Sequence, residues 1–174
     1  MSRVFLLDRS GSMEVCRDDT ITGYNSFVES QKEFGGTMSL YQFDHEVLCV
    51  YENVPIENVE PLTLDTFEPR GGTSLLDAMG YILKKSFPDG TVVIILTDGD
   101  ENSSHTYTSA HIKDLIDMRQ TQNDWKFIYL GANQDVITNA TRLGIRTSSS
   151  FDTQRTSEMF ATLSPLVSRT MTNQ

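Results

Sequence analysis

Oxygen-bearing side chains follow two of the most apolar segments of the chain, and a third group of them opens a predicted helix. The first segment, Val4–Leu7, leads into an Asp-x-Ser-x-Ser pattern, and the second, Val92–Leu96, leads into Thr97-Asp98-Gly99. A Gly-Gly-Thr-Ser stretch at 71–74 lies between them. The candidate ligands are Asp8, Ser10, Ser12, Thr73 and Asp98. Carboxylates and hydroxyls bind hard divalent cations, and a set with few carboxylates suits Mg²⁺, which keeps several waters. Mn²⁺ or Ca²⁺ could take the same ligands.

The elements that must position these residues can be read from apolar spacing. Five segments have the length of strands: Val4–Leu7, Leu40–Phe43, Val47–Tyr51, Val92–Leu96 and Phe127–Leu130. The first, fourth and fifth are continuous apolar runs, which is typical of strands covered on both faces. The second and third flank Asp44-His45, which we predict to be a hairpin turn.

Helical spacing fills the intervals between these strands. The apolar positions that mark the five predicted helices run over 21–34, 75–87, 112–119, 136–143 and 159–167. Gly35-Gly36, Pro88 and Gly144 supply stop signals, and the apolar positions of the last helix are expected to pack in the core. Alternating strands and helices predict an α/β fold, a doubly wound, Rossmann-like, mostly parallel sheet of about six strands. One antiparallel edge strand and helices on both faces complete this prediction. Such a sheet binds ligands beyond the carboxyl ends of its strands.

Length and composition favour one domain that covers residues 1–174. The chain is 38% hydrophobic, which is enough to bury a core. The loop from Asn53 to Gly72 is expected to be a connector within that one domain. The formal net charge of -10 disfavours nucleic acid and anionic membranes as partners. No apolar run has the length of a bilayer span or a signal peptide, and the two cysteines, Cys16 and Cys49, form no metal or disulfide pattern. We therefore expect a cytoplasmic protein with two ordinary thiols, Cys49 packed in or beside a strand.

The five candidate ligands resemble the metal-ion-dependent adhesion site of the von Willebrand factor A (vWA) domain. That site has Asp-x-Ser-x-Ser in one loop, a Thr in a second and an Asp in a third, and all five positions are present here. The resemblance covers nearly the whole chain. It is nearest to the small, stand-alone intracellular members of bacteria and phages, for which the segments at 6–12 and 130–135 are typical.

The resemblance implies a role for each residue. Ser10 and Ser12 would bind the cation through their hydroxyls, Thr73 directly or through water, and Asp8 and Asp98 largely through water. One coordination position would stay open for an Asp or Glu of a partner protein. Gly11, Gly71, Gly72 and Gly99 would allow tight turns near the ion.

Other interpretations of these residues stay open. Asp8, Ser10 and Ser12 could form a turn or cap cluster. Asp100 and Glu101 could extend the metal site, and Glu14, Asp18 and Asp19 could modulate it, although acidic residues near a helix start are usually solvated.

The main rival function is a phosphotransferase of the haloacid-dehalogenase type, in which the first Asp is the nucleophile. That family has an acid/base Asp two residues later, where this chain has Ser10, and a Lys at the phosphate. The nearest candidates, Lys84 and Lys85, come late in a predicted helix. P-loop and Gly-x-Ser-x-Gly motifs are absent. We expect a binding module rather than an enzyme, and a purely structural assembly subunit is a third hypothesis.

Overall fold

The computed structural model describes residues 1–98, 101–132 and 135–172. Its centre is a six-stranded sheet with the order β3-β2-β1-β4-β5-β6. The strands are β1 (Ser2–Asp8), β2 (Thr37–Phe43), β3 (Val47–Pro55), β4 (Val92–Thr97), β5 (Lys126–Ala132) and β6 (Thr147–Phe151). β3 is antiparallel to β2, and the other neighbours are parallel. The predicted mostly parallel sheet with one antiparallel edge strand is confirmed.

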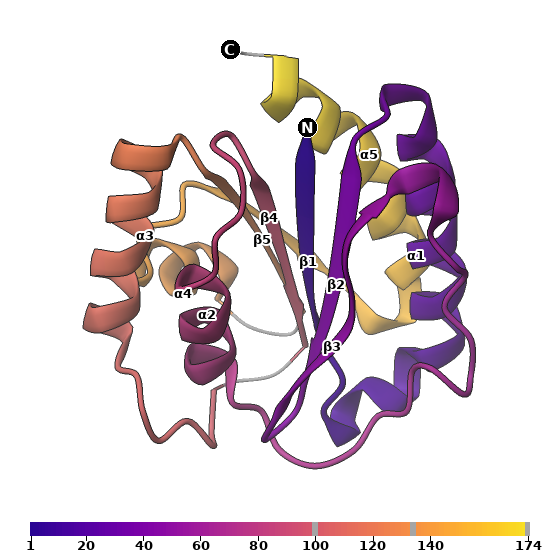
Figure 1. Ribbon diagram of the computed structural model, residues 1–174. Helices are drawn as coiled ribbons and strands as arrows, with labels where there is room; N and C mark the ends of the chain where they lie inside the picture. Colours follow the sequence, from indigo (N-terminus) through magenta and orange to yellow (C-terminus); the bar gives the residue numbers. More distant parts are fainter. Residues whose placement is uncertain (99–100, 133–134, 173–174) are drawn as a thin grey trace.

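Helices cover both faces of the sheet (Figure 1). One face carries α1 (Arg17–Gln31) and α5 (Thr156–Thr172), and the other carries α2 (Leu75–Leu83), α3 (Ser109–Asn123) and α4 (Val136–Arg142). Four short 3₁₀ helices lie in the connections: η1 (Gly11–Cys16), η2 (Lys32–Phe34), η3 (Ile56–Asn58) and η4 (Thr153–Arg155). Because the parallel strands share one direction, the loops that follow β1 and β4 meet at one edge of the sheet.

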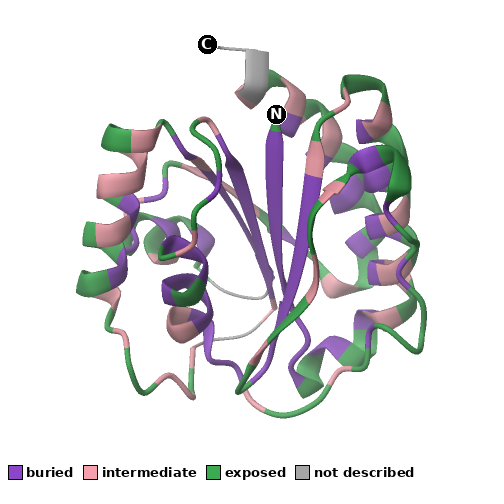
Figure 2. Cartoon of the chain, in the orientation of Figure 1, coloured by how far each residue is buried: buried purple, intermediate pink, exposed green. Residues whose placement is uncertain are grey.

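The core has two halves, because side chains alternate across each central strand. On β1, Phe5 and Leu7 pack under α1 and α5, whereas Val4 and Leu6 pack under α2 and α3. All four are fully buried. Figure 2 shows this pattern for the whole sheet, whose central strands are buried while the outer sides of the helices are exposed. The continuous apolar runs in the sequence are therefore the consequence of burial on both faces.

Several details of the elements differ from the sequence-based predictions. β6 was not located, because its sequence, Thr-Ser-Ser-Ser-Phe, contains no apolar run. α2 ends at Leu83, so Phe87 is buried in a loop and not on the predicted helix. The predicted helical ranges 21–34 and 136–143 include Phe34 and Ile137 among their apolar positions, but these side chains are 41% and 74% exposed. β3 extends to Pro55, so the predicted loop from Asn53 begins inside a strand.

Three further side chains, Trp125, Cys16 and Cys49, differ in how far they are buried. Trp125 is buried beside the start of β5 and packs against Phe87 and Phe127, with the Arg119 guanidinium over its ring. Cys49 does lie in a strand, but its side chain is exposed, whereas Cys16 is buried.

The last helix packs in the core as predicted: Met159, Phe160, Leu163 and Val167 are buried. No helix in the described part of the chain combines the length and apolarity needed to cross a membrane.

The contact between α1 and α5 gives a test of the packing. A Cβ atom on Gly23 would lie 2.3 Å from Cδ2 of Phe160, which is buried in the core and cannot move away easily. We expect Gly23→Ala to lower the free energy of unfolding by up to about 2 kcal/mol, because overpacking costs about 1–3 kcal/mol. The gain of about 1 kcal/mol in helix propensity offsets part of this cost.

The measurement is urea denaturation, with Ser26→Ala as the control because Ser26 is exposed on the same helix. A Gly23→Ala protein as stable as the control would show that α5 does not pack on α1 in this way.

Candidate metal centre

Asp8 lies at the end of the central strand β1, with its carboxylate buried at the carboxyl edge of the sheet. β1 and β4 pair with Leu7 opposite Leu96, so Asp8 stands level with Thr97 at the end of β4. Oδ2 of Asp8 accepts a hydrogen bond from the Thr97 hydroxyl at 2.8 Å, and Oδ1 accepts one from the Ser10 amide at 2.6 Å. The carboxylate is thus held by hydrogen bonds on both oxygens.

A chain of hydroxyls joins this first loop to Asp98. The hydroxyls of Ser10 and Ser12 are 3.1 Å apart, and the Ser12 hydroxyl donates to Oδ1 of Asp98 at 2.8 Å. Ser10 is buried, whereas Ser12 is exposed at the outer side of the loop. These four predicted ligands therefore form one contiguous oxygen cluster between the ends of β1 and β4.

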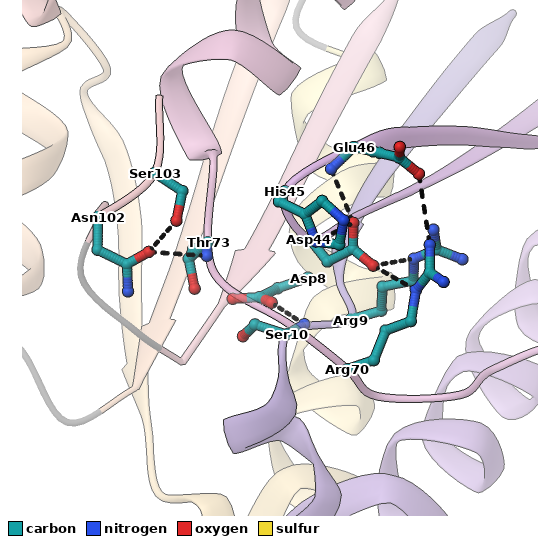
Figure 3. A network of polar contacts seen from close by, with 10 residues as sticks. All are labelled: Asp8, Arg9, Ser10, Asp44, His45, Glu46, Arg70, Thr73, Asn102 and Ser103. Atoms are coloured by element: carbon teal, nitrogen blue, oxygen red, sulfur yellow. Dashed lines mark hydrogen bonds and ion pairs between the residues drawn. The ribbon is translucent and has the colours of Figure 1, made fainter. Parts of the chain in front are cut away.

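Thr73 reaches the cluster from the loop that precedes α2. Two backbone hydrogen bonds tie this loop to the first one: the Arg70 amide donates to the Arg9 carbonyl at 2.7 Å, and the Gly11 amide donates to the Gly71 carbonyl at 3.1 Å. Thr73 is buried, and Figure 3 shows its side chain turned toward the Asp8 carboxylate. The structure thus brings all five predicted ligands to one place.

The two carboxylates of the cluster have no cationic partner among the described residues. Burial raises the pKa of Asp8 to about 6, against the opposing effect of hydrogen bonds from Ser10 and Thr97, and the nearby charge of Asp98 raises it further. Burial also raises the pKa of Asp98, although the Ser12 hydroxyl opposes this. Among the residues that the structure describes, no Arg, Lys or His forms an ion pair with either one.

The nearest arginine, Arg9, is directed to a different carboxylate. Its Nε lies 3.2 Å from Oδ2 of Asp44, the buried residue that follows β2, and Nε of Arg70 lies 2.7 Å from the same oxygen. Figure 3 shows this group beside the site, with Glu46 bonded to both Asp44 and Arg70. Burial opposes ionisation of Asp44, but the Glu46 amide and the two guanidinium groups hold its pKa below the usual value. Asp44 is therefore compensated by two arginines, whereas Asp8 has no ion pair with any described residue.

The donor set fits a hard divalent cation. It offers two carboxylates and three hydroxyls, and the Thr73 hydroxyl makes no hydrogen bond to any described residue. A cation among these oxygens would compensate the buried charge of Asp8 and the half-buried charge of Asp98. Within residues 1–98, 101–132 and 135–172, no three His, Cys, Asp or Glu side chains gather as a metal site.

The predictions for the loop glycines have mixed outcomes. Gly71 has φ +67°, and a Cβ there would meet Nδ1 of His45 at 2.6 Å. The positive φ makes Gly71 a position that favours glycine, whereas a Cβ on Gly72 would lie 2.4 Å from the Ser103 hydroxyl and would force that side chain to move. Gly11 has ordinary contacts and no such requirement. Gly99 lies outside the described residues, as do Asp100, Asn133 and Gln134 of the segments named above.

The nearby acidic residues take other positions. Glu101 accepts a hydrogen bond from the Ser104 amide at 3.0 Å, which stabilises its own loop. Glu14 lies in η1, and Asp18 and Asp19 lie in the first turn of α1, where negative charge favours the helix dipole. Together they line a surface pocket of about 380 Å³ beside η4.

Sequence reasoning missed three residues that shape the site. Thr97 belongs to the Thr97-Asp98-Gly99 pattern, but its hydrogen bond to Asp8 could not be predicted from that pattern because it depends on strand register. Asp44 was placed in a turn without its ion pairs. Asn102 carried no signal, yet its side-chain oxygen accepts a hydrogen bond from the Thr73 amide at 2.9 Å.

Comparison with known proteins gives matches among solved structures alone. No protein-family model matches the chain, and no curated protein sequence does. The vWF domain of the pilus tip protein Mfa5 from Porphyromonas gingivalis has a TM-score of 0.69 at 10% identity, over 99% of this chain and 96% of that one. Manganese-loaded TRAP from Plasmodium vivax has a TM-score of 0.65 at 15% identity, over 98% of this chain and 73% of that one.

The mussel byssus protein PTMP1 is similar to the same degree, with a TM-score of 0.67 at 15% identity over 95% of this chain. The chain spans about half the length of PTMP1, since the match covers 47% of that protein. Identities this low establish the fold alone. From the sheet order, the helices on both faces and these likenesses, we conclude that the chain has a von Willebrand factor A-like fold.

Proposed function

We propose that this chain is a protein-binding module that depends on a divalent cation. Asp8, Ser10, Ser12, Thr73 and Asp98 hold the ion, and an Asp or Glu of the partner protein completes its coordination. The observation that carries the proposal is the buried carboxylate of Asp8, which has two hydrogen bonds and a carboxylate neighbour but no ion pair within the described chain.

The energetics of this carboxylate favour a bound cation. Burial of an ionised carboxylate without a compensating charge is costly, and buried charges in proteins are paired or coordinate metals. Asp8 and Asp98 supply two negative charges, and the three hydroxyls supply neutral ligands. A dication bound mainly by neutral oxygens keeps positive charge and attracts an incoming carboxylate. Mg²⁺ fits this set best, and the manganese in the similar TRAP structure supports a divalent ion.

The charge of the whole chain gives the ion a second role. With a formal net charge of -10, the surface repels an acidic partner except where a cation reverses the local sign. The ion therefore selects the contact point as well as anchoring the partner.

The two other functional hypotheses have less support. A phosphotransferase of the haloacid-dehalogenase type needs an acid/base Asp at the position of Ser10 and a Lys at the phosphate. Lys84 and Lys85 follow the C-terminal end of α2, whereas Thr73 precedes its N-terminal end, and Nζ of Lys85 lies 2.9 Å from Glu52. A purely structural subunit would not need an uncompensated carboxylate at Asp8.

Metal binding should stabilise the protein through Asp98. We expect Mg²⁺ or Mn²⁺ to raise the melting temperature of the wild type, because a ligand at a hundred times its Kd adds about 2.7 kcal/mol to folding stability. Asp98→Ala should lose this increase. In the presence of a chelator it should melt at or above the wild-type temperature, since it removes one of two neighbouring carboxylates.

The measurement is thermal unfolding with Mg²⁺ and with a chelator. Asp114→Ala is the matched control, because Asp114 is exposed on α3 and its loss changes the net charge equally. If Mg²⁺ raised the melting temperature of Asp98→Ala as much as that of the control, the ion would have to bind elsewhere.

Partner binding should depend on the same ion and on a carboxylate. A partner captured from the native host in Mg²⁺ should bind the wild type and Asp114→Ala with equal affinity. It should bind Asp98→Ala about 10–100-fold more weakly, which is the range for losses at metal sites. Chelation, or amidation of the partner's contacting Asp or Glu, should have the same effect.

Titration calorimetry with purified partner measures these affinities. Binding that survives both chelation and Asp98→Ala would favour the structural-subunit hypothesis over this one.

A further inference from the structure

The segment Glu101–Thr108, which comes after β4, lies against the loop that carries Thr73. Asn102 pairs with Thr73 in both directions: its amide donates to the Thr73 carbonyl at 3.0 Å, and its side-chain Oδ1 accepts from the Thr73 amide at 2.9 Å. The Ser103 amide donates to the same carbonyl at 3.2 Å. Both backbone polar groups of Thr73 are therefore held by this segment. Figure 3 shows the bond between the Thr73 amide and the Asn102 side chain.

The Asn102 side chain is itself held in this orientation. The Ser103 hydroxyl donates to its Oδ1 at 2.5 Å, so that oxygen accepts two hydrogen bonds. The approach is close because position 72 is glycine: a Cβ there would lie 2.4 Å from the Ser103 hydroxyl and 3.2 Å from Oδ1 of Asn102. A side chain at position 72 would therefore force the Ser103 hydroxyl to move.

Asp77 on α2 anchors the rest of the segment. Its carboxylate accepts the amides of His105, Thr106 and Tyr107 at 2.8–3.0 Å. Although burial opposes it, these hydrogen bonds hold the pKa of Asp77 below its usual value. The ring of Tyr107 covers Gly80, where a Cβ would lie 2.3 Å from the ring. The segment is thus fixed to α2 at one end and to Thr73 at the other.

From these contacts we infer that Asn102 is a positioning residue for the cation site, which acts by fixing the backbone of Thr73. This inference rests on the proposed function. The Thr73 hydroxyl has no hydrogen bond to a described residue that could orient it, so its place beside Asp8 depends on the backbone. The segment that holds this backbone follows the strand that leads to Asp98. Asn102 therefore joins the second and third ligand loops, although it is exposed and is not itself a ligand.

The test measures Mn²⁺ affinity by titration calorimetry and exchange of the Thr73 amide by NMR on the metal-free protein. We expect Asn102→Ala to bind Mn²⁺ about tenfold more weakly, as for other partners that orient metal ligands. Its Thr73 amide should exchange about tenfold faster than in the wild type, because it loses a hydrogen bond.

Two variants separate positioning from simple disturbance of the segment. Asn102→Asp keeps the acceptor oxygen, so it should keep the Thr73 amide protected and bind Mn²⁺ at least as tightly as the wild type. Thr106→Ala removes an exposed side chain from the same segment, while Asp77 still binds its amide, so both readouts should match the wild type.

Three results would overturn the inference. The first is wild-type Mn²⁺ affinity in Asn102→Ala, and the second is Mn²⁺ affinity in Asn102→Asp as weak as in Asn102→Ala despite a protected Thr73 amide. The third, a wild type that binds no Mn²⁺, would refute the proposed function as well. That case is recognisable because amide exchange would still respond to Asn102→Ala.

Discussion

A buried carboxylate that has no cationic partner in the described part of the chain is the constraint on which the rest of this structure depends. Asp8 ends the central strand of the sheet, between β2 and β4, at a point with no access to solvent. The Ser10 amide and the Thr97 hydroxyl donate hydrogen bonds to this carboxylate and partly stabilise its charge. The hydroxyls of Ser10 and Ser12 continue the oxygen cluster to Asp98. Hydrogen bonds lessen the cost of such a charge, and a bound cation would compensate it.

Strand register decides which groups surround Asp8. Because β1 and β4 pair with Leu7 opposite Leu96, the next residues, Asp8 and Thr97, stand side by side where the strands end. On the other side Asp8 pairs with Phe43, so Arg9 comes next to Asp44, and the Arg9 amide donates to the Phe43 carbonyl. A shift of one residue in either pairing would turn the side chains to the opposite face. Burial of both sheet faces fixes the register, and the register assembles the site.

The sequence was sufficient where burial leaves a pattern and insufficient where geometry alone decides. Val4–Leu7 and Val92–Leu96 were predicted as strands because both of their faces are covered. β6 lies at an edge, where five residues with a single apolar side chain, Phe151, can still pair, so it left no such pattern.

The residues of the candidate site also differ in how far the sequence could predict them. The five candidate ligands were predicted from a motif whose residue types are set by their chemistry, and the structure brings these five side chains together. Asn102 and Asp44 act through backbone contacts and ion pairs between distant loops, and these arise only once the chain has folded.

The β2–β3 hairpin has an electrostatic consequence beyond closing the edge of the sheet. Arg9 follows Asp8 directly, and a guanidinium turned toward that carboxylate would neutralise it, since an adjacent arginine favours the charged form of an aspartate. Asp44 instead holds Arg9 at 3.2 Å and shares its carboxylate with Arg70. The pair satisfies two charges that would otherwise compete for the site. By holding the arginine away, the hairpin leaves Asp8 and Asp98 without an ion pair among the described residues, and two uncompensated carboxylates favour binding of a divalent cation.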